Sequence, residues 1–211
     1  MRIGTWNLAG RWTPDHERFL LDLDCDVLLL TEVSERFTLA GHHLHLSEAL
    51  MAPRRRWAGV ASRPPLTPVP DPHPASAMAA VDGWTFCSSI LPWRSCGNRD
   101  PWQGTRHADK TTAAVERLLE RLPTDRFVWG GDWNHALSGR EWSGSIGGRT
   151  SILAALEKLG LDVPTALLPH RIEGLLSIDH IAVPSGTEVT EATAVDADSL
   201  SDHDAYVVEL R

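Results

Sequence analysis

The feature that most constrains the fold of this chain is a short apolar run that ends at two polar residues. Residues 127–129 (Phe-Val-Trp) are typical of a strand buried on both faces, because neither face carries a polar side chain. The glycines at 130 and 131 predict a sharp turn of the backbone. Asp132 and Asn134 then lie just beyond the carboxyl end of the strand, where open α/β proteins bind ligands. A carboxylate there can hold a metal or accept a proton, and a carboxamide can donate a hydrogen bond.

Two earlier strands are predicted to end in the same way. Residues 2–8 alternate between apolar and polar side chains, which favours a strand that carries Asn7 at its end. Residues 27–30 are all apolar and predict a buried strand that ends at Thr31 and Glu32. A surface carboxylate at a strand end is common, but four apolar residues directly before Glu32 favour a functional role.

The remaining pattern alternates helices and strands along the chain. Thr13-Pro14 predicts a helix start, because threonine is a good N-cap and proline suits the first turn. Two further helices are expected around residues 115–122 and 152–159, the second closed by Gly160. Further strands are expected at residues 59–63, 84–91, 178–183 and 205–210, and loops at 64–74 and 137–148. Interleaved elements of this kind imply sheets covered by helices.

Length and composition favour one globular domain over residues 1–211, with no membrane span. Three cysteines at unrelated spacings suggest free thiols, so we expect a cytoplasmic protein, and we expect it to be a monomer.

The net charge is −8, but the charges are distributed unevenly along the chain. Residues 54–106 carry seven arginines against three aspartates, whereas the segments on either side are acidic. A basic middle on an acidic body would suit a phosphate-bearing substrate. Equally, Arg54-Arg55-Arg56 can be a solvated turn.

Two loops combine arginine with tryptophan, the side chains that bind phosphates and stack on bases. The first follows the strand predicted to end at Leu91 and the second follows Asn134. The candidate substrate-binding residues in them are Trp93, Arg94, Trp102, Arg140 and Trp142. Most tryptophans pack in cores, so each of the three can instead support its loop.

Five motifs in order resemble the endonuclease/exonuclease/phosphatase superfamily, which includes DNases, abasic-site endonucleases, sphingomyelinases and inositol-polyphosphate phosphatases. The motifs are Thr5-Trp6-Asn7, Thr31-Glu32, Gly131-Asp132-Trp133-Asn134, Ile178-Asp179-His180 and Ser201-Asp202-His203. They span nearly the whole chain. The resemblance implies an α/β (α+β) fold, a four-layer α/β/β/α sandwich of two packed mixed sheets flanked by helices.

The resemblance also implies roles for these residues, and their chemistry agrees. Glu32 would be the principal ligand of Mg²⁺, with Mn²⁺ as a substitute, and Asn7 and Asp202 would complete or support the metal shell. Asp132 would align or deprotonate the attacking water, and Asn134 would hold the phosphoryl oxygens. His203 would contact the phosphate, oriented by a hydrogen bond to Asp179. His180 would point to the other face of its strand and be structural.

The chain departs from the family after the strand predicted to end at Leu91. Members usually carry a histidine or tyrosine there, whereas this sequence reads Pro92-Trp93-Arg94. Arg94 or His107 is a candidate to replace that group.

Two classes of function follow from these residues. The first is a metal-dependent phosphoric ester hydrolase: a nuclease, or alternatively a phosphatase or phosphodiesterase for a small-molecule or lipid ester. The arginine- and tryptophan-bearing loops favour nucleic acid, and the acidic total favours the small ester. The second class is a binding protein that has lost catalysis on the same fold.

Overall fold

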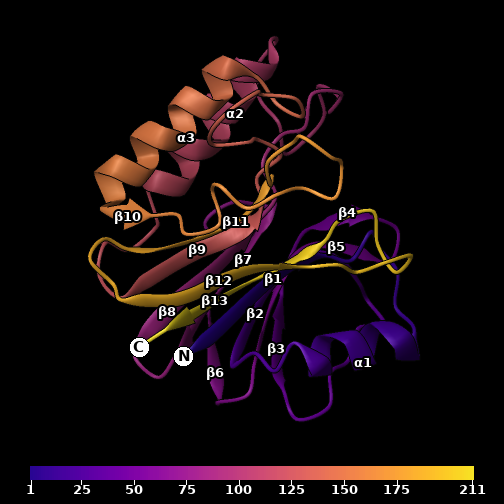
Figure 1. Ribbon diagram of the computed structural model, residues 1–211. Helices are drawn as coiled ribbons and strands as arrows, with labels where there is room; N and C mark the ends of the chain where they lie inside the picture. The colour runs from indigo at the N-terminus through magenta and orange to yellow at the C-terminus, as the bar shows by residue number, and fades with distance from the viewer.

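The strands form two sheets that pack face to face, as seen in the computed structural model of residues 1–211 (Figure 1). The 7-stranded sheet contains β1 (Arg2–Asn7), β2 (Val27–Ser34), β3 (His43–Leu46), β4 (Leu50–Ala52), β5 (Arg55–Ser62), β12 (Val189–Val195) and β13 (Ala205–Leu210). The 6-stranded sheet contains β6 (Leu66–Val69), β7 (Ser76–Val81), β8 (Trp84–Ser89), β9 (Phe127–Asp132), β10 (Leu161–Asp162) and β11 (Asp179–Pro184).

Each sheet is mixed, with one parallel pair near its centre. The strand orders are β12-β13-β1-β2-β5-β3, with β4 beside β5, and β10-β11-β9-β8-β7-β6. The parallel pairs are β1 with β2 and β8 with β9, and the other pairs are antiparallel. Strands β1, β2 and β9, which carry three of the polar motifs, belong to these parallel pairs, and β11, which carries a fourth, lies beside β9.

The continuous apolar run of β2 is explained by burial on both of its faces. Val27 and Leu29 belong to the core between the sheets, while Leu28 and Leu30 pack in a second core under α1 (Pro14–Asp22). Alternate residues of a strand point to opposite faces, so a strand covered on both sides needs apolar residues throughout.

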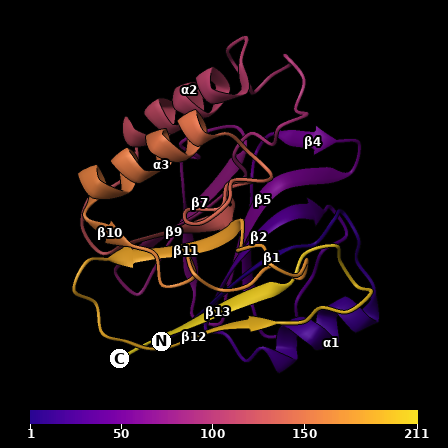
Figure 2. The ribbon, with the colours of Figure 1, turned by 45° about the horizontal axis from the view of Figure 1, so that its top comes forward.

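Helices cover the outer face of the second sheet as well. Helices α2 (His107–Leu119) and α3 (Ile146–Leu159) lie side by side, joined by a hydrogen bond of 2.7 Å between the hydroxyls of Thr112 and Ser151 (Figure 2). Helix α1 lies on the opposite side of the molecule (Figures 1 and 2). The four-layer α/β/β/α arrangement expected from the sequence is confirmed.

The two glycines of the central strand do not make the sharp turn that their sequence predicts. Strand β9 continues through both of them to Asp132. A Cβ at Gly130 would lie 2.6 Å from the carbonyl oxygen of His180, and one at Gly131 would lie 2.3 Å from that of Ser89. Glycine is therefore required because the strands on either side approach β9 closely, and Gly131 also has a φ of +117°.

Burial and pairing create strands that the local sequence does not predict. The prolines of residues 64–74 predict a loop, yet β6 lies there with Pro68 on the edge of its sheet, where a proline costs no internal hydrogen bond. Strands β7 and β12 have no clear signal, because the alanines in their sequences give no alternation. The loop expected over 137–148 ends at Ser145, whose side chain caps α3 by accepting from the Gly148 amide at 3.1 Å.

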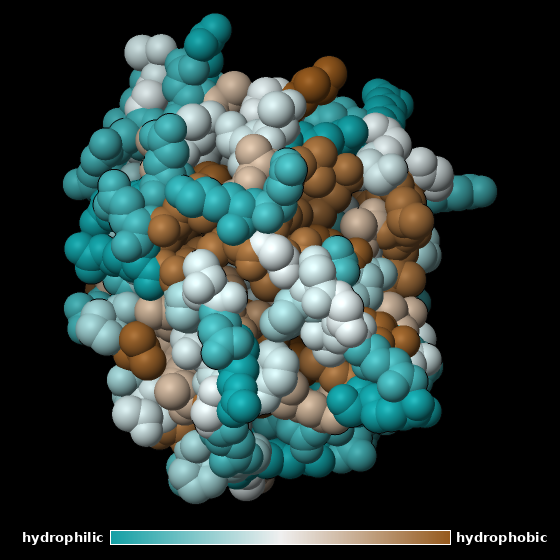
Figure 3. Space-filling model, turned by 90° about the vertical axis from the view of Figure 1, so that its left-hand side faces the viewer, coloured by the Kyte–Doolittle hydropathy of each residue, from teal (hydrophilic) through white to brown (hydrophobic).

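The outer side of α3 leaves part of its apolar surface exposed. A shallow groove of about 340 Å³ runs beside the helix, lined by apolar side chains that include Leu153 and Leu156. Figure 3 views the face on the left of Figure 1, and hydrophobic atoms gather across its upper part. None of the three helices combines the length and the apolar character required to cross a lipid bilayer.

Candidate active site

The polar residues singled out in the sequence meet where the two sheets face each other. Asn7 ends β1 and Glu32 lies in β2 of one sheet, while Asp132 ends β9 and Asp179 begins β11 of the other. Asp132 and Asp179 are direct partners in the antiparallel pairing of β9 with β11. Packing of the sheets then brings the two pairs together, although Asn7 and Asp132 are 125 residues apart in the chain.

Asn7 links the two sheets with its side-chain amide. Its Nδ2 donates to Oδ2 of Asp132 at 2.9 Å and lies 3.4 Å from Oε1 of Glu32. Its Oδ1 accepts the Ala9 amide at 2.9 Å, and the residue is 1% exposed. In this orientation Asn7 holds two carboxylates in place, and its role in the metal shell stays a prediction.

Glu32 stands out from its strand. The sequence predicts that β2 ends at this residue, but the strand continues to Ser34. Glu32 and Trp57, which lie opposite each other, are both missing from the pairing of β2 with β5, while the register is the same on either side of them. Glu32 has a φ of +50°, a conformation that glutamate rarely adopts. Its side chain is 21% exposed and its Oε2 accepts Nη1 of Arg55 at 2.7 Å. Backbone strain of this kind is concentrated at functional sites.

Asp132 and Asn134 form a local turn at the end of β9. Oδ1 of Asp132 accepts the Asn134 amide at 3.0 Å, and Asn134, with a φ of +53°, donates its Nδ2 to the carbonyl of Leu91 at 3.1 Å. Burial, followed by the Asp179 carboxylate, raises the pKa of Asp132 to about 7, against the opposing effects of His203 and Asn7. Asp132 can therefore take up a proton near neutral pH.

His203 and Asp179 form the hydrogen bond that the sequence predicts. Nδ1 of His203 donates to Oδ2 of Asp179 at 2.7 Å, and Nε2 lies 4.0 Å from Oδ2 of Asp132. Burial by itself would lower the pKa of His203, but the carboxylates of Asp179 and Asp132 outweigh it and raise the pKa to about 10. The imidazole therefore carries a positive charge at neutral pH.

Two further contacts fix the segment that carries His203. Trp6 donates its indole N–H to the His203 carbonyl at 3.0 Å, and the Ser201 hydroxyl donates to the Asn7 carbonyl at 2.6 Å. The C-terminal loop is thereby anchored to β1.

These groups border a cavity of about 150 Å³ that contains the carboxylates of Glu32 and Asp132. Its lining residues are Glu32, Met51, Ile90, Trp93, Asp132, Asn134 and His203. One ligand atom each from Asp132, Asp179 and His203 lie within 4.8 Å of one another, and Oδ1 of Asp179 is buried with no hydrogen-bond partner. Carboxylate oxygens around a small cavity are the donor set that Mg²⁺ prefers, so the residues fit a hard divalent cation.

The small cavity adjoins a wider one of about 580 Å³, and the two share Trp93, Asn134 and His203. The wider cavity is also lined by Arg94 and Trp142. The indole N–H of Trp142 donates to the Leu176 carbonyl at 3.1 Å, and Nε and Nη2 of Arg94 both donate to the Gly144 carbonyl. Three of the five candidate rim residues therefore border the site.

Trp102, the fourth of these five candidates, and His107, the candidate to replace the family's histidine or tyrosine, lie elsewhere. Trp102 is 5% exposed and packs against Trp57 and Trp93, so its ring is covered and cannot stack on a substrate. Both ring nitrogens of His107 are hydrogen-bonded, to Ser145 and to the carbonyl of Pro92, and the residue lines neither cavity.

Two more predicted site residues lie outside the small cavity. Arg140 is exposed and borders neither cavity. Asp202 is exposed and borders the wider cavity next to His203, and its part in a metal shell stays a prediction.

Two residues of the site are not predicted from the sequence. Arg55 is only one member of an arginine run there, but its ion pair with Glu32 turns it toward the carboxylates. His170 borders the wider cavity with its ring 4.6 Å from that of Trp142, and its Nδ1 accepts the Ile172 amide at 3.0 Å. The arginine run gives some signal for Arg55, and nothing in the sequence pattern indicates His170.

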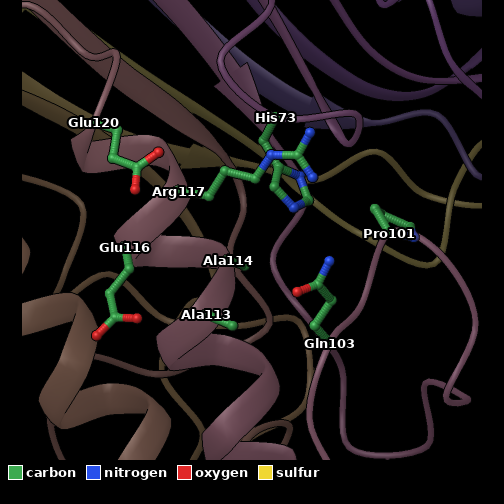
Figure 4. Close-up of a pocket in the computed structure, with 8 residues that line it drawn as sticks. All are labelled: His73, Pro101, Gln103, Ala113, Ala114, Glu116, Arg117 and Glu120. Carbon is green, nitrogen blue, oxygen red and sulfur yellow. The ribbon is translucent and has the colours of Figure 1, made fainter.

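A separate cavity of about 390 Å³ lies beside α2 (Figure 4). Glu116 and Arg117 lie on α2 and Glu120 follows its last residue, and the Arg117 guanidinium lies next to the His73 ring in Figure 4. These three charged residues are exposed. This cavity contains no buried carboxylate and is not a candidate active site.

No protein-family model matches this sequence, and no curated protein matches it. Solved structures do match over the whole chain. An AP endonuclease, LMAP, from Leishmania major has a TM-score of 0.72 at 14% identity, with 100% of this chain and 87% of that chain covered. An endonuclease/exonuclease/phosphatase protein from Beutenbergia cavernae has a TM-score of 0.71 at 16% identity, with coverage of 100% and 71%. The endonuclease domain of TRAS1, a telomere-specific non-LTR retrotransposon, has a TM-score of 0.68 at 15% identity, with coverage of 100% and 97%.

At these identities the likeness concerns the backbone fold, and it agrees with the four-layer arrangement described above. The resemblance seen in the sequence motifs is confirmed at that level. The chain has the fold of the endonuclease/exonuclease/phosphatase superfamily.

Proposed function

We propose that this protein is a metal-dependent phosphodiesterase that hydrolyses nucleic acid. The observation that carries the proposal is the meeting of Glu32, Asp132 and the Asp179–His203 pair at one small cavity that adjoins a tryptophan-lined one. Structural neighbours named as endonucleases support the same class of reaction. The alternative of a small ester finds less support, because a small substrate would leave Trp93 and Trp142 without a partner.

Glu32 would hold the cation, Mg²⁺ or Mn²⁺, through its partly exposed carboxylate. When bound, the cation would supply positive charge to the phosphoryl and leaving oxygens. Glu32 is already held by Asn7 and Arg55 on its two oxygens, so its carboxylate is positioned before any ligand arrives.

Asp132 would accept a proton from the attacking water. Its raised pKa, about 7, is suited to a group that must be ionised before the reaction and protonated after it. Asn7 and the Asn134 amide fix the two carboxylate oxygens, so the base has one orientation.

His203 and Asn134 would contact the phosphate. His203 is protonated at neutral pH, and Asp179 fixes its ring so that Nε2 remains for a phosphoryl oxygen. One N–H of the Asn134 side chain is bonded to Leu91, and the second would donate to another phosphoryl oxygen.

The site is built from one chain, so we propose that the protein acts as a monomer. Its three cysteines are all free and buried, which is consistent with the cytoplasmic location that we propose.

The test is a hydrolysis panel with three substrates: a DNA oligonucleotide, bis(p-nitrophenyl) phosphate and p-nitrophenyl phosphate. Each is incubated with Mg²⁺, with Mn²⁺ and with EDTA. We expect metal-dependent cleavage of both diesters, with the oligonucleotide preferred, and no cleavage in EDTA or by Asp132→Asn. Cleavage of the monoester alone would favour a phosphatase, and no cleavage of any substrate would favour a binding protein.

A further inference from the structure

A basic cavity lies next to Glu32, because Arg55 lines it and pairs with the Glu32 carboxylate at 2.7 Å. It has a volume of about 250 Å³, and its lining includes Trp12, Ser34, Arg36, Arg54 and Arg55. We propose that this cavity binds a second phosphate of the substrate, the one next to the phosphate being cleaved in a nucleic acid strand. The inference rests on the proposed function and specifies its substrate, one that carries at least two phosphates.

The charge of this cavity is unbalanced. Arg36 and Arg54 are exposed and form no ion pair. Glu35, which precedes Arg36, is turned toward Arg56 at 2.7 Å, and no acidic side chain lines the cavity. The arginines are the only charged residues of this lining, and Arg55 alone is paired, through Glu32, so the guanidinium groups of Arg36 and Arg54 are available to an anion.

The cavity beside α2 provides the contrast. Its one arginine, Arg117, shares the lining with Glu116 and Glu120, so its charges are opposed within the cavity. Hollows on this surface are therefore not basic in general, and the excess of arginine is particular to the cavity beside Glu32.

The arginines come from separate turns of the chain that the fold brings together. Arg36 follows β2, while Arg54 and Arg55 lie at the turn from β4 into β5. Guanidinium groups bind phosphate oxygens in pairs through their planar fork of N–H donors. The Ser34 hydroxyl already accepts the Arg36 amide at 3.3 Å and adds a donor to the lining.

One ion pair connects this cavity with the candidate active site. Arg55 lines the basic cavity, Glu32 lines the small catalytic one, and their side chains are 2.7 Å apart. A nucleic acid strand carries one phosphate per ~3.4 Å of helix axis. With the reacting phosphate in the small cavity, a neighbouring phosphate of the strand would be available to Arg36 and Arg54 in the adjoining basic cavity, and a minimal diester has no such phosphate.

The test uses two substrates, a DNA dinucleotide with a single phosphodiester and a longer oligonucleotide. The variant is Arg36→Gln/Arg54→Gln, at two exposed positions where folding should be unaffected. We expect it to raise KM for the oligonucleotide about tenfold more than for the dinucleotide. The dependence of log KM on log salt should also fall by ~0.7 for each phosphate that the variant no longer binds. Arg117→Gln is the matched control, an exposed arginine in the α2 cavity, and should change neither substrate.

Equal changes on both substrates, or an unchanged salt dependence, would overturn the inference. Fluorescence anisotropy of a labelled oligonucleotide in EDTA measures binding without turnover, and the double variant should bind about tenfold more weakly. If the wild type cleaves nothing but this weaker binding is seen, the proposed function fails and the phosphate site stands. Two results together would show that the cavity binds no phosphate of the strand. The first is that inorganic phosphate competes with the oligonucleotide equally in the wild type and the double variant. The second is that the double variant binds the labelled oligonucleotide as tightly as the wild type does.

Discussion

The candidate active site and the cavity beside α2 are both polar hollows, but they are built differently. The α2 cavity has a volume of about 390 Å³, between the small cavity of the candidate site, about 150 Å³, and the wider one, about 580 Å³. Its charged residues, Glu116, Arg117 and Glu120, lie on α2 and at the C-terminal end of this helix and are exposed (Figure 4). The candidate site takes its charged residues from β2, β9, β11 and the C-terminal loop, and hydrogen bonds fix most of them.

The two regions therefore differ in how firmly their charged groups are oriented. In the candidate site, burial keeps water away from Asp132 and Asp179, so their charges act strongly on each other and on His203. In the α2 cavity, solvent screens Glu116 and Arg117, so their charges act only weakly on each other. Three measurements should probe this contrast between the two regions, and the largest expected effect comes first.

Glu32→Gln should lower kcat/KM for the oligonucleotide by roughly 100-fold or more, because glutamine keeps the shape of the side chain but loses the charge that would hold the cation. The measurement is Mg²⁺-dependent hydrolysis, with thermal unfolding to confirm that the variant is folded. Glu116→Gln makes the same change in the α2 cavity and should have no effect. Wild-type turnover by Glu32→Gln at saturating Mg²⁺ would remove Glu32 from the site.

Acid should destabilise both regions in a similar way. Burial lowers the pKa to about 4 for His73 beside α2 and for His135 and His180 beneath the candidate site. Between pH 6.5 and 4 the unfolded chain binds protons at these positions and the folded chain does not. The free energy of unfolding therefore falls as pH drops through this window, by up to ~1.4 kcal/mol per pH unit for each histidine.

Asp132 acts in the opposite direction, because its raised pKa lets the folded state bind a proton first. The measurement is the slope of the free energy of unfolding against pH, obtained from urea unfolding at several pH values. This slope is compared between the wild type and the variants. His73→Phe and His180→Phe should each reduce the slope by about one proton. An unchanged slope in either variant would mean that the histidine is protonated in the folded state.

Two tryptophans give the smallest and most specific contrast in activity. Trp142 borders the wider cavity, and stacking on a base contributes ~1–3 kcal/mol. Trp142→Ala should therefore raise KM about tenfold for an oligonucleotide and little for bis(p-nitrophenyl) phosphate. Trp102→Ala should instead lower the free energy of unfolding by ~3–5 kcal/mol, because Trp102 is packed in the core, while KM stays at the wild-type value. Equal loss on both substrates in Trp142→Ala would assign that residue to the fold.

The sequence by itself determined the central strands and the polar residues that follow them. Runs such as residues 27–30 and 127–129 predict buried strands because only a covered strand is apolar throughout. Spaced motifs in the right order identified the fold, and they led to the hydrogen bond between Asp179 and His203, which is confirmed at 2.7 Å.

Tertiary structure alone decided which side chains face the cavities. Trp93 and Trp102 lie in one loop of similar composition, yet one borders the site and the other is in the core. Arg55 pairs with Glu32 because β5 lies beside β2, a neighbour that local sequence does not specify. Strand pairing and sheet packing join segments far apart in the chain, and the direction of a side chain depends on those contacts. Local pattern therefore predicts the buried strands, whereas the members of the site emerge only when both sheets are packed together.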